Sequence, residues 1–535
     1  MSLTSRTRRA ALALTSIALL AATLGAGAAT AAPGDATAEA VTLTPLGTYT
    51  TGAFDEGASE IVAHDPATQR VFVVNAQAGT VDVLDISDPT APAKVGTLDT
   101  PGANSVAVHG GLIAVAEQAE TRTDPGTVTF FDAESLAKLR SLPAGALPDM
   151  VTFTPDGKSV LVANEGEPEG YCAGQVDPVG SITVVDLANG VEKARVRTAG
   201  FQSFTGRAAQ LEAEGVRLTG PGASVAQDLE PEYITTSQDG RTAWATLQEA
   251  NAVAVIDVRA ARIVDIVPLG LKDHSVPGQG LDASKDDGGV DITTHPVKGM
   301  YMPDAISAYS TPAGEEYLVT ANEGDAREYD CFEEEVDVED LTLDPAAFPD
   351  ADALQREENL GGLKVTSTSP QGPDGYTELH AFGGRSVSIL DRSGAMVWDS
   401  GDALERVIAE SHPEDFNSTN DENGSFDDRS DNKGPEPEGV SVGAIGEHRY
   451  AFVGLERDSG IAVVDVTDPA TAGLVGYVSN RDFDGDAEAG TAGDLGPEGL
   501  HFVAAQDSPT GEPLLIVGNE ISGTTTIWQV EAPGA

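Results

Sequence analysis

The sequence predicts an all-β protein, a seven-bladed β-propeller of four-stranded antiparallel blades. Three features predict it: one strand pattern occurs seven times, the last copy has only three strands, and a strand without a partner precedes the first copy. A repeated β-unit indicates an array in which each unit buries its faces against its neighbours. The seven copies begin at Glu60, Ser105, Asp149, Glu232, Asp304, Glu438 and Glu498.

The sixth copy shows the pattern most clearly. Apolar or alternating segments predict strands at 438–443, 450–455, 461–466 and 474–478, separated by short turns and loops. Four antiparallel strands in each unit are typical of a propeller blade. Each other copy is interpreted in the same way.

The seventh copy is expected to be completed by the opposite end of the chain. It contains strands at 500–502, 514–519 and 524–530, after which the chain ends. Residues 41–50 form a strand-like segment just before the first copy. We expect this N-terminal strand to close the last blade, because the pairing removes an open sheet edge.

Most of the extra sequence is expected on one face of the propeller. Loops between the second and third strands and loops between blades emerge on the same side, and insertions on one face of a repeat protein often mark the binding face. Short helices are expected within them at about 205–214 and 403–410. The inserts span 165–180, 201–229, 272–302, 324–384, 400–435 and 480–495.

The N-terminus has the features of a secretory signal peptide. Three arginines among the first nine residues precede an apolar run and then small residues, the order expected of an exported protein. Cleavage is expected near Ala31, with Ala32 as the alternative, and the Sec and Tat routes both remain open. Later stretches are too short or too polar to span a bilayer, so we expect a secreted, extracellular protein.

The predicted layout is therefore simple. Residues 1–31 form the signal peptide, 32–40 a short linker, 41–530 the propeller and 531–535 a tail. Because the repeats span nearly the whole mature chain, we expect one closed array and a monomer.

The net charge of the chain limits the kinds of molecule that it can bind. The chain has 86 acidic and 31 basic residues, a net charge of −55. Such a field repels nucleic acid and anionic membranes and attracts cations and basic partners. A salt-tolerant extracellular surface accounts for the bulk charge equally well, but it leaves carboxylates gathered in one place unexplained.

The two cysteines occupy equivalent loops. Cys172 follows an Asn-Glu-Gly motif in the third copy and Cys331 follows the same motif in the fifth. In an exported protein this arrangement predicts a disulfide bond, with two separate thiols as the alternative.

Two repeated acidic positions are expected to converge on the insert-bearing face. One starts the innermost strand of most blades, and the other ends the second strand. Carboxylates 5–6 Å apart repel by about 3 kcal/mol at an effective dielectric constant near 20, so a ring of them needs bound cations, raised pKa values or hydrogen-bond donors. The candidate metal ligands at these positions are Glu60, Asp149, Glu165, Glu232, Asp304, Glu323, Glu438, Glu456, Glu498 and Glu520.

Oxygen ligands favour Ca²⁺, with another divalent cation as the alternative. Asp482, Asp484 and Asp486 add oxygens at alternate positions of one insert, and 415–431 is dense in Asp and Asn. The alternatives are that Pro-Asp and Pro-Glu steps cap turns and that both acidic segments are solvated loops. The spacing of His and Cys gives only weak support for zinc.

Four arginines are expected on the same face: Arg327, Arg385, Arg457 and Arg481. Arginine beside metal-binding carboxylates suits a phosphate or sulfate ester site, so these are the candidate catalytic residues. The alternative is that each arginine neutralises a neighbouring carboxylate. The sequence contains no recognisable nucleophile elbow or P-loop motif.

Several motifs of the chain are long and specific: 164–168, 320–329, 434–439, 480–486 and 493–499. Together they resemble the choice-of-anchor I family of exported bacterial proteins, and the resemblance covers about residues 41–530. Relatives of this family include mesenchyme-specific cell-surface glycoproteins of sea urchins and atypical bacterial alkaline phosphatases, so the resemblance implies a secreted propeller with calcium handling or phosphatase activity. The C-terminus lacks an anchor motif, which puts cell-surface attachment in doubt.

Two functions follow from these residues. The first is a calcium-binding propeller that recognises an extracellular ligand or matrix. The second is a metal-dependent phosphoesterase that acts on a phosphorylated substrate at the same face, so enzymatic activity stays open. A lactonase-like or redox propeller is disfavoured because histidines are not clustered.

Overall fold

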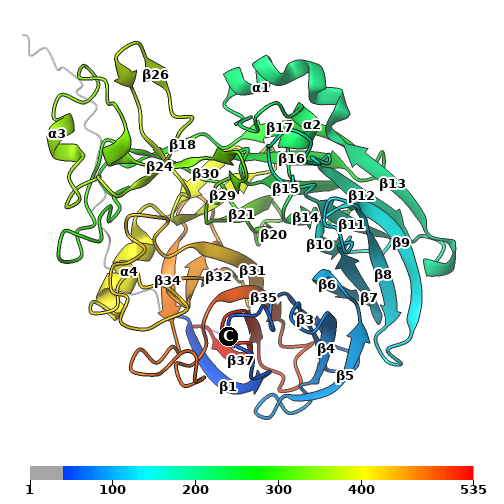
Figure 1. The fold of residues 1–535 in the computed structure, drawn as a ribbon. Coiled ribbons are helices and arrows are strands. Elements are labelled where there is room, and N and C mark those ends of the chain that lie inside the picture. The colour runs from blue at the N-terminus through cyan, green and yellow to red at the C-terminus, as the bar shows by residue number, and fades with distance from the viewer. Residues whose placement is uncertain (1–39, 534–535) are drawn as a thin grey trace, which may run out of the picture. The chain divides into compact units, whose positions relative to one another are not determined.

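The computed structural model describes residues 40–533. The predicted signal peptide, most of the linker and the last two residues of the tail lie outside the described residues. Residues 40–533 adopt an all-β fold that contains seven four-stranded antiparallel sheets, which follow one another along the chain from blue to red in Figure 1.

The first three sheets have strands in simple chain order. The first sheet contains β2 (Val62–Asp65), β3 (Arg70–Asn75), β4 (Thr80–Asp85) and β5 (Ala93–Asp99). The second contains β6 (Ala103–His109), β7 (Leu112–Glu117), β8 (Pro125–Asp132) and β9 (Lys138–Ala146). The third contains β10 (Pro148–Phe153), β11 (Ser159–Asn164), β12 (Ser181–Asp186) and β13 (Arg195–Gly200).

The next three sheets repeat this order, and a long insert divides the fifth. The fourth sheet contains β14 (Ile234–Thr236), β15 (Thr242–Leu247), β16 (Ala252–Asp257) and β17 (Arg262–Pro268). The fifth contains β20 (Ile306–Ser310), β21 (Glu316–Asn322), β29 (Ser386–Asp391) and β30 (Met396–Asp399). The sixth contains β31 (Pro437–Ile445), β32 (His448–Leu455), β33 (Gly460–Asp465) and β34 (Gly473–Val478).

The seventh sheet joins the two ends of the described chain. It contains β35 (Pro497–Val503), β36 (Leu514–Asn519), β37 (Thr524–Glu531) and β1 (Thr42–Thr50). Strand β1 pairs antiparallel with β37, from Thr42 opposite Glu531 to Thr50 opposite Thr524. The register shifts between Pro45 and Gly47, where proline has no N–H to donate to a ladder. The strand expected at 41–50 therefore lies at the edge of the last sheet.

The core lies between neighbouring sheets. One cluster joins residues of the first and second sheets, such as Val74 and Ile113, and another joins the seventh and first, such as Ile516 and Val71. The second and third strands have apolar side chains on both faces because both faces are covered, as in β32 and β33. The fourth strands are more exposed, as in β5.

The first strands of the sheets contact one another in chain order. Contacts join β2 to β6, β6 to β10, β10 to β14, β14 to β20, β20 to β31 and β31 to β35, and β35 in turn contacts β2. The ends of these strands are therefore close together, which positions the site described below.

The inserts contain the helices and further sheet structure. The helix expected at 205–214 is a 3₁₀ helix, Phe201–Arg207, followed by α1 (Ala208–Glu214). The helix expected at 403–410 is α4 (Ala403–Ser411). The inserts also contain α2 (Val225–Asp228), α3 (Ala351–Leu354) and the 3₁₀ turn Val338–Asp340, whereas the 3₁₀ turn Val191–Lys193 joins β12 to β13.

A five-stranded sheet within the inserts was not predicted from the sequence. Its order is β18 (Leu271–Asp273), β19 (Lys298–Met300), β28 (His380–Ala381), β25 (Lys364–Thr366) and β24 (Glu335–Asp337). Strands of two or three residues give too short a periodic signal to be recognised. Two small hairpins accompany it, formed by β22 (Glu328–Tyr329) with β23 (Phe332–Glu333) and by β26 (Gln371–Gly372) with β27 (Gly375–Tyr376).

Within residues 40–533, helices that combine the length and the apolar character needed to cross a bilayer are absent.

Candidate metal centre

A cavity of about 380 Å³ lies where the first strands begin, and we call it the central cavity. Its walls come from all seven sheets and from the inserts, and they are mostly acidic. Its charged lining residues are Asp149, Glu232, Asp304, Glu323, Asp325, Lys433, Glu438, Glu456, Arg457 and Glu498.

In three sheets, a proline followed by an acidic residue begins the first strand, and the same backbone irregularity positions each carboxylate. The pairing register shifts between Pro148 and Val151, between Pro437 and Val440, and between Pro497 and Leu500. Such an irregularity leaves residues unpaired in the ladder and redirects a side chain. The acidic residue after each of these prolines lies in the shifted segment and lines the cavity.

Three carboxylates on one side of the centre form what we call the acidic cluster: Asp149 in β10, Glu165 after β11 and Glu232 before β14. One oxygen from each lies within 4.8 Å of the others. Burial raises the pKa of Asp149 to about 7, and the carboxylate of Glu167 adds to the shift. Burial and mutual repulsion raise the pKa values of Glu165 and Glu232 well above the usual range. The charges acting most strongly on these groups are all negative.

A second group of three, Glu323, Glu436 and Glu456, also has oxygens within 4.8 Å of one another, and we call it the neutralised cluster. Lys433 Nζ lies 3.7 Å from Glu323 Oε1 and 3.7 Å from Glu436 Oε2. Burial alone would raise the pKa of Glu436, but nearby basic groups, Lys433 first, lower it to about 2.

Two arginines complete this neutralisation. Arg429 Nη2 lies 2.5 Å from Glu436 Oε1, and Arg457 Nε lies 3.1 Å from Glu436 Oε2. Arg457 Nη1 also lies 3.3 Å from Glu456 Oε1. These basic side chains neutralise Glu436, whereas burial and neighbouring carboxylates still raise the pKa of Glu323 to about 7 and that of Glu456 well above its usual range.

The remaining predicted cavity ligands surround these clusters. Asp304, Glu438 and Glu498 line the cavity, and Oε2 of both glutamates is buried without a hydrogen-bond partner among the described residues. Burial, Glu520 and Asp149 raise the pKa of Glu60 to about 8. Burial likewise raises the pKa of Glu520.

The structure does not bring Asp482, Asp484 and Asp486 to the cavity. They lie exposed in the insert after β34. Asp482 Oδ1 accepts the backbone N–H of Asp484 at 3.1 Å, and Asp486 Oδ1 accepts that of Ala489 at 2.9 Å. These carboxylates cap their own turn.

Only one of the four candidate arginines lines the cavity, namely Arg457. Arg327 is 1 % exposed and binds Asp228 at 2.5 Å and Glu230 at 2.8 Å. Arg385 binds Glu405 and the backbone carbonyls of residues 282, 430 and 432. Arg481 binds the carbonyls of residues 419, 422 and 457. Arg327, Arg385 and Arg481 therefore hold parts of the inserts together through buried ion pairs and hydrogen bonds.

Sequence reasoning left Glu436 out of the ligand set and gave Lys433 no specific partner. The signal that would have identified Glu436 is the repeated Pro-Glu pair at 435–438. Gln248, which follows β15 at the position where most second strands end in an acidic residue, also lines the cavity, and its Nε2 donates to Glu323 Oε2 at 2.8 Å.

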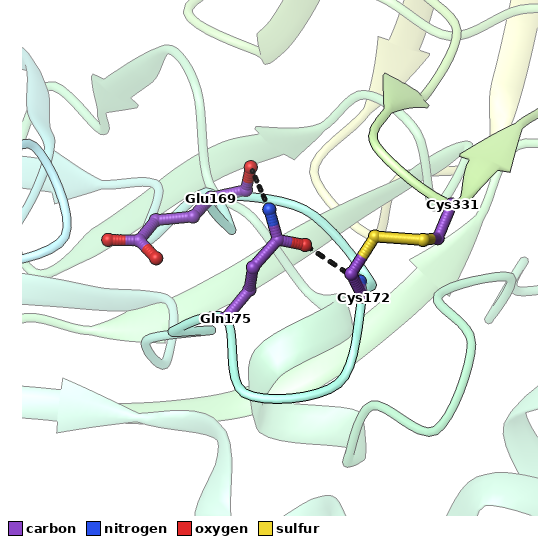
Figure 2. The surroundings of a disulfide bond; sticks show 4 residues. All are labelled: Glu169, Cys172, Gln175 and Cys331. Atoms are coloured by element: carbon purple, nitrogen blue, oxygen red, sulfur yellow. Dashed lines mark hydrogen bonds between the residues drawn. A yellow bond between two sulfur atoms is a disulfide. The ribbon is translucent and has the colours of Figure 1, made fainter.

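The disulfide bond between Cys172 and Cys331 is confirmed (Figure 2). It joins the loop after β11, which carries Glu165, to the loop after β21. Figure 2 also shows Gln175, whose Oε1 accepts the N–H of Cys172 at 2.7 Å. Beside the bond, the Tyr329 hydroxyl donates to Glu167 at 2.8 Å. The loop that supplies one member of the acidic cluster is therefore covalently fixed.

The fold and cavity define the class: an all-β protein of repeated four-stranded sheets with an acidic cavity at the ends of its first strands. The sequence model of the choice-of-anchor I domain matches residues 60–469, and the chain belongs to this family. The resemblance seen in the sequence motifs is thereby confirmed.

Known proteins similar to the chain include two from marine animals. The mesenchyme-specific cell surface glycoprotein of Strongylocentrotus purpuratus is 32% identical over 291 residues, which are 47% of this chain and 36% of that protein. Gigasin-3a of Magallana gigas is 31% identical over 195 residues, 33% of this chain and 67% of that protein. The match thus spans about a third of the sea-urchin protein's length.

Among solved structures, the chain is similar to the β-propeller domain of Cps50 (Swd1) from Myceliophteria thermophila. The TM-score is 0.45 at 10% identity, over 92% of this chain and 100% of that one. A similarity at this level carries no argument about function.

Proposed function

We propose that the chain is an exported, closed seven-bladed β-propeller that binds calcium in its central cavity and recognises an extracellular ligand or matrix at the surrounding face. Seven four-stranded sheets, the pairing of β1 with β37 and the contact between β35 and β2 support a closed ring.

The acidic cluster is the observation that carries the cation-binding proposal. It holds three carboxylate oxygens within 4.8 Å of one another, with negative groups as the dominant neighbours. Carboxylates this close are stable only when protonated or when a cation lies between them. Oxygen ligands at such spacing suit a hard cation, and calcium accepts irregular geometry more readily than magnesium.

Export and an extracellular partner have separate support. Disulfide bonds persist in oxidising compartments, and Cys172 is bonded to Cys331. The sea-urchin relative carries the words cell surface glycoprotein in its name. The ligand is expected at the inserts that surround the cavity.

Calcium binding is tested by comparing one member of each cluster. Wild-type protein, Glu232→Gln and Glu456→Gln are stripped with EGTA, and calcium binding is measured by titration calorimetry. We expect Glu232→Gln to lose the cavity ion and Glu456→Gln to keep it, because the cluster of Glu456 has three basic neighbours around Glu436 and the acidic cluster has none among its dominant neighbours. Equal binding by all three proteins would overturn the assignment.

A phosphoesterase is the second candidate, because Lys433 and Arg457 line the same cavity as the acidic cluster. A bound cation together with these bases would offer positive charge to a phosphate ester. The phosphoesterase ranks second because Lys433 and Arg457 already form ion pairs with Glu436. The test is turnover of a chromogenic phosphate ester with Ca²⁺, Mg²⁺, Mn²⁺ or Zn²⁺. Wild-type turnover no higher than that of a Glu438→Gln, Arg457→Ala double variant excludes this activity.

A further inference from the structure

The inserts contain a second buried group of oxygen atoms, separate from the central cavity. Asp282 and Asn417 are 0 % exposed and Asp427 is 1 % exposed. Asn417 Nδ2 donates to Ser430 Oγ at 2.8 Å, and Ser430 Oγ donates to Asp427 Oδ1 at 2.5 Å. These bonds hold Asn417 and Asp427 together at the two ends of one loop.

Glu405 of α4 links this loop to Asp282. Its Oε1 accepts from Asn417 Nδ2 at 3.3 Å, and its Oε2 accepts the backbone N–H of Asp282 at 3.1 Å. A continuous chain of hydrogen bonds therefore connects all three residues, although they come from inserts more than 100 positions apart in the sequence.

Two oxygen atoms in this group have no partner among the described residues. Asp427 Oδ2 and Asn417 Oδ1 are buried and accept no hydrogen bond. An unsatisfied buried acceptor is costly, and native proteins leave few of them. A cation bound between the two oxygens would satisfy both acceptors at once and would also balance the charge of the buried carboxylate.

The charges in this region lead to the same conclusion. Arg385 pairs with Glu405 at 2.7 Å, and Lys285 pairs with Asp431 at 3.1 Å. Among the described residues, neither the Asp282 carboxylate nor the Asp427 carboxylate forms an ion pair, and Arg385 contacts only the backbone carbonyl of Asp282. Burial raises the pKa of Asp282 to about 7 and that of Asp427 to about 6. A buried carboxylate without a counter-charge is strongly destabilising unless a cation or a proton is bound.

We propose that Asp427 Oδ2, Asn417 Oδ1 and the Asp282 carboxylate bind a calcium ion, at what we call the insert site. The donors are all oxygen atoms, and calcium accepts mixed carboxylate and amide oxygens in a protein cage. Backbone N–H groups of Ser284 and Asp291 hold the Asp282 carboxylate at 3.4 and 2.6 Å. They leave lone pairs on both of its oxygens free.

The insert site would fasten the loop at 415–431 to the rest of the inserts. Asn420 of this loop donates to Glu456 of the neutralised cluster at 2.9 Å. A calcium ion here would therefore support one wall of the central cavity without lying in it.

The test compares Asp427→Asn with Asp428→Asn, an exposed neighbour in the same loop. Asparagine tolerates the positive φ of 68° at position 427, so the variant is expected to fold. Radioactive calcium bound per chain is measured by equilibrium dialysis for wild-type protein, for both variants and for Glu232→Gln. Asp427→Asn is expected to bind one ion fewer than wild type, and Asp428→Asn the same number. Glu232→Gln is expected to lose one ion if the central cavity binds calcium. The result for Glu232→Gln therefore tests the cavity site, and the result for Asp427→Asn tests the insert site.

Proteolysis gives a second, independent measurement on the wild-type protein and on the same two variants. Trypsin cleavage after Arg429 is followed in wild-type protein with calcium and with EGTA. We expect calcium to slow this cleavage at least tenfold in wild type and in Asp428→Asn, but not in Asp427→Asn. Calcium binding by Asp427→Asn equal to wild type, or cleavage at the same rate with calcium and EGTA, would overturn the insert site.

Discussion

The acidic cluster and the neutralised cluster have the same local geometry but differ in their basic neighbours, which lower the pKa of Glu436 and leave those of Glu323 and Glu456 raised. In each, three carboxylate oxygens lie within 4.8 Å of one another at the wall of one cavity. Around Asp149, Glu165 and Glu232 the dominant neighbours are acidic. Around Glu436 they are Lys433, Arg457 and Arg429, and the pKa of Glu436 falls to about 2.

The difference teaches that carboxylate spacing alone does not define a metal site. The charge of what lies beside the carboxylates decides whether they hold a protein cation or need an external one. The two clusters therefore form an internal control, and four predictions test the contrast, from the largest expected effect to the smallest.

Substitution Glu436→Gln is expected to destabilise the fold by about 3–5 kcal/mol, because it leaves Arg429, Lys433 and Arg457 without their shared partner. The control is Glu438→Gln, two residues away. The pKa of Glu438 is raised by burial and by acidic neighbours, so the loss of its charge should leave stability unchanged or raise it. Urea unfolding in EGTA measures both. A smaller loss for Glu436→Gln than for Glu438→Gln would contradict the comparison.

Removal of the disulfide by a Cys172→Ser, Cys331→Ser double variant is expected to cost about 2–4 kcal/mol of stability. It should also weaken calcium binding at the acidic cluster, because Glu165 lies in the loop that Cys172 anchors. Glu436 lies outside both bridged loops, so its pKa should stay low. Calorimetric titration with calcium checks the first effect, and unchanged affinity would show that the loop is held without the bond.

Substitution Lys433→Gln is expected to convert the neutralised cluster into a weak cation site. It removes the ammonium group that lies 3.7 Å from both Glu323 and Glu436. Equilibrium dialysis should then find one additional calcium ion per chain, bound at least about tenfold more weakly than the first, since two arginines remain. The control is Lys158→Gln, an exposed lysine paired with Asp156. No additional ion would show that the arginines alone exclude calcium.

The smallest expected effect is a dependence on pH. Asp149 has a pKa of about 7 in the metal-free fold, above its unfolded value. A carboxylate with a raised folded pKa contributes stability below its unfolded pKa and loses it as pH rises through the folded value. Metal-free protein should thus melt at a lower temperature at pH 8 than at pH 5.5, and calcium affinity should rise across that range as the carboxyl loses its proton. Thermal melts in EGTA and in calcium at both pH values check this, and a metal-free melting temperature that rises with pH would contradict it.

Much of the fold was accessible from the sequence because the signals are local and repeated. Alternating and apolar runs bounded by turns predicted the strands, and the unpartnered segment before Glu60 predicted the strand that pairs with β37. The sheet of two- and three-residue strands in the inserts was missed, since such strands have no measurable period.

The candidate site was predicted less completely. The Pro-acidic steps gave the carboxylates at the strand ends, and these line the cavity or lie beside it. The partners of the arginines were harder to predict. An arginine side chain reaches about 6 Å in several directions, so its neighbour in the sequence need not be its partner in the fold. Arg327, Arg385 and Arg481 bind groups in other inserts, whereas Arg457 alone lines the cavity.

The sequence by itself determined the repeated strands, the acidic positions at their ends and the equivalent loops of the two cysteines. These are properties of single segments, and they depend only on residues close together in the sequence. The tertiary structure decided which carboxylates share a cluster and which bases neutralise them. Lys433 lies 110 positions from Glu323 in the chain, yet their charged groups are 3.7 Å apart. Electrostatic interaction depends on distance in space and on burial, and both are set only when the sheets and inserts pack together.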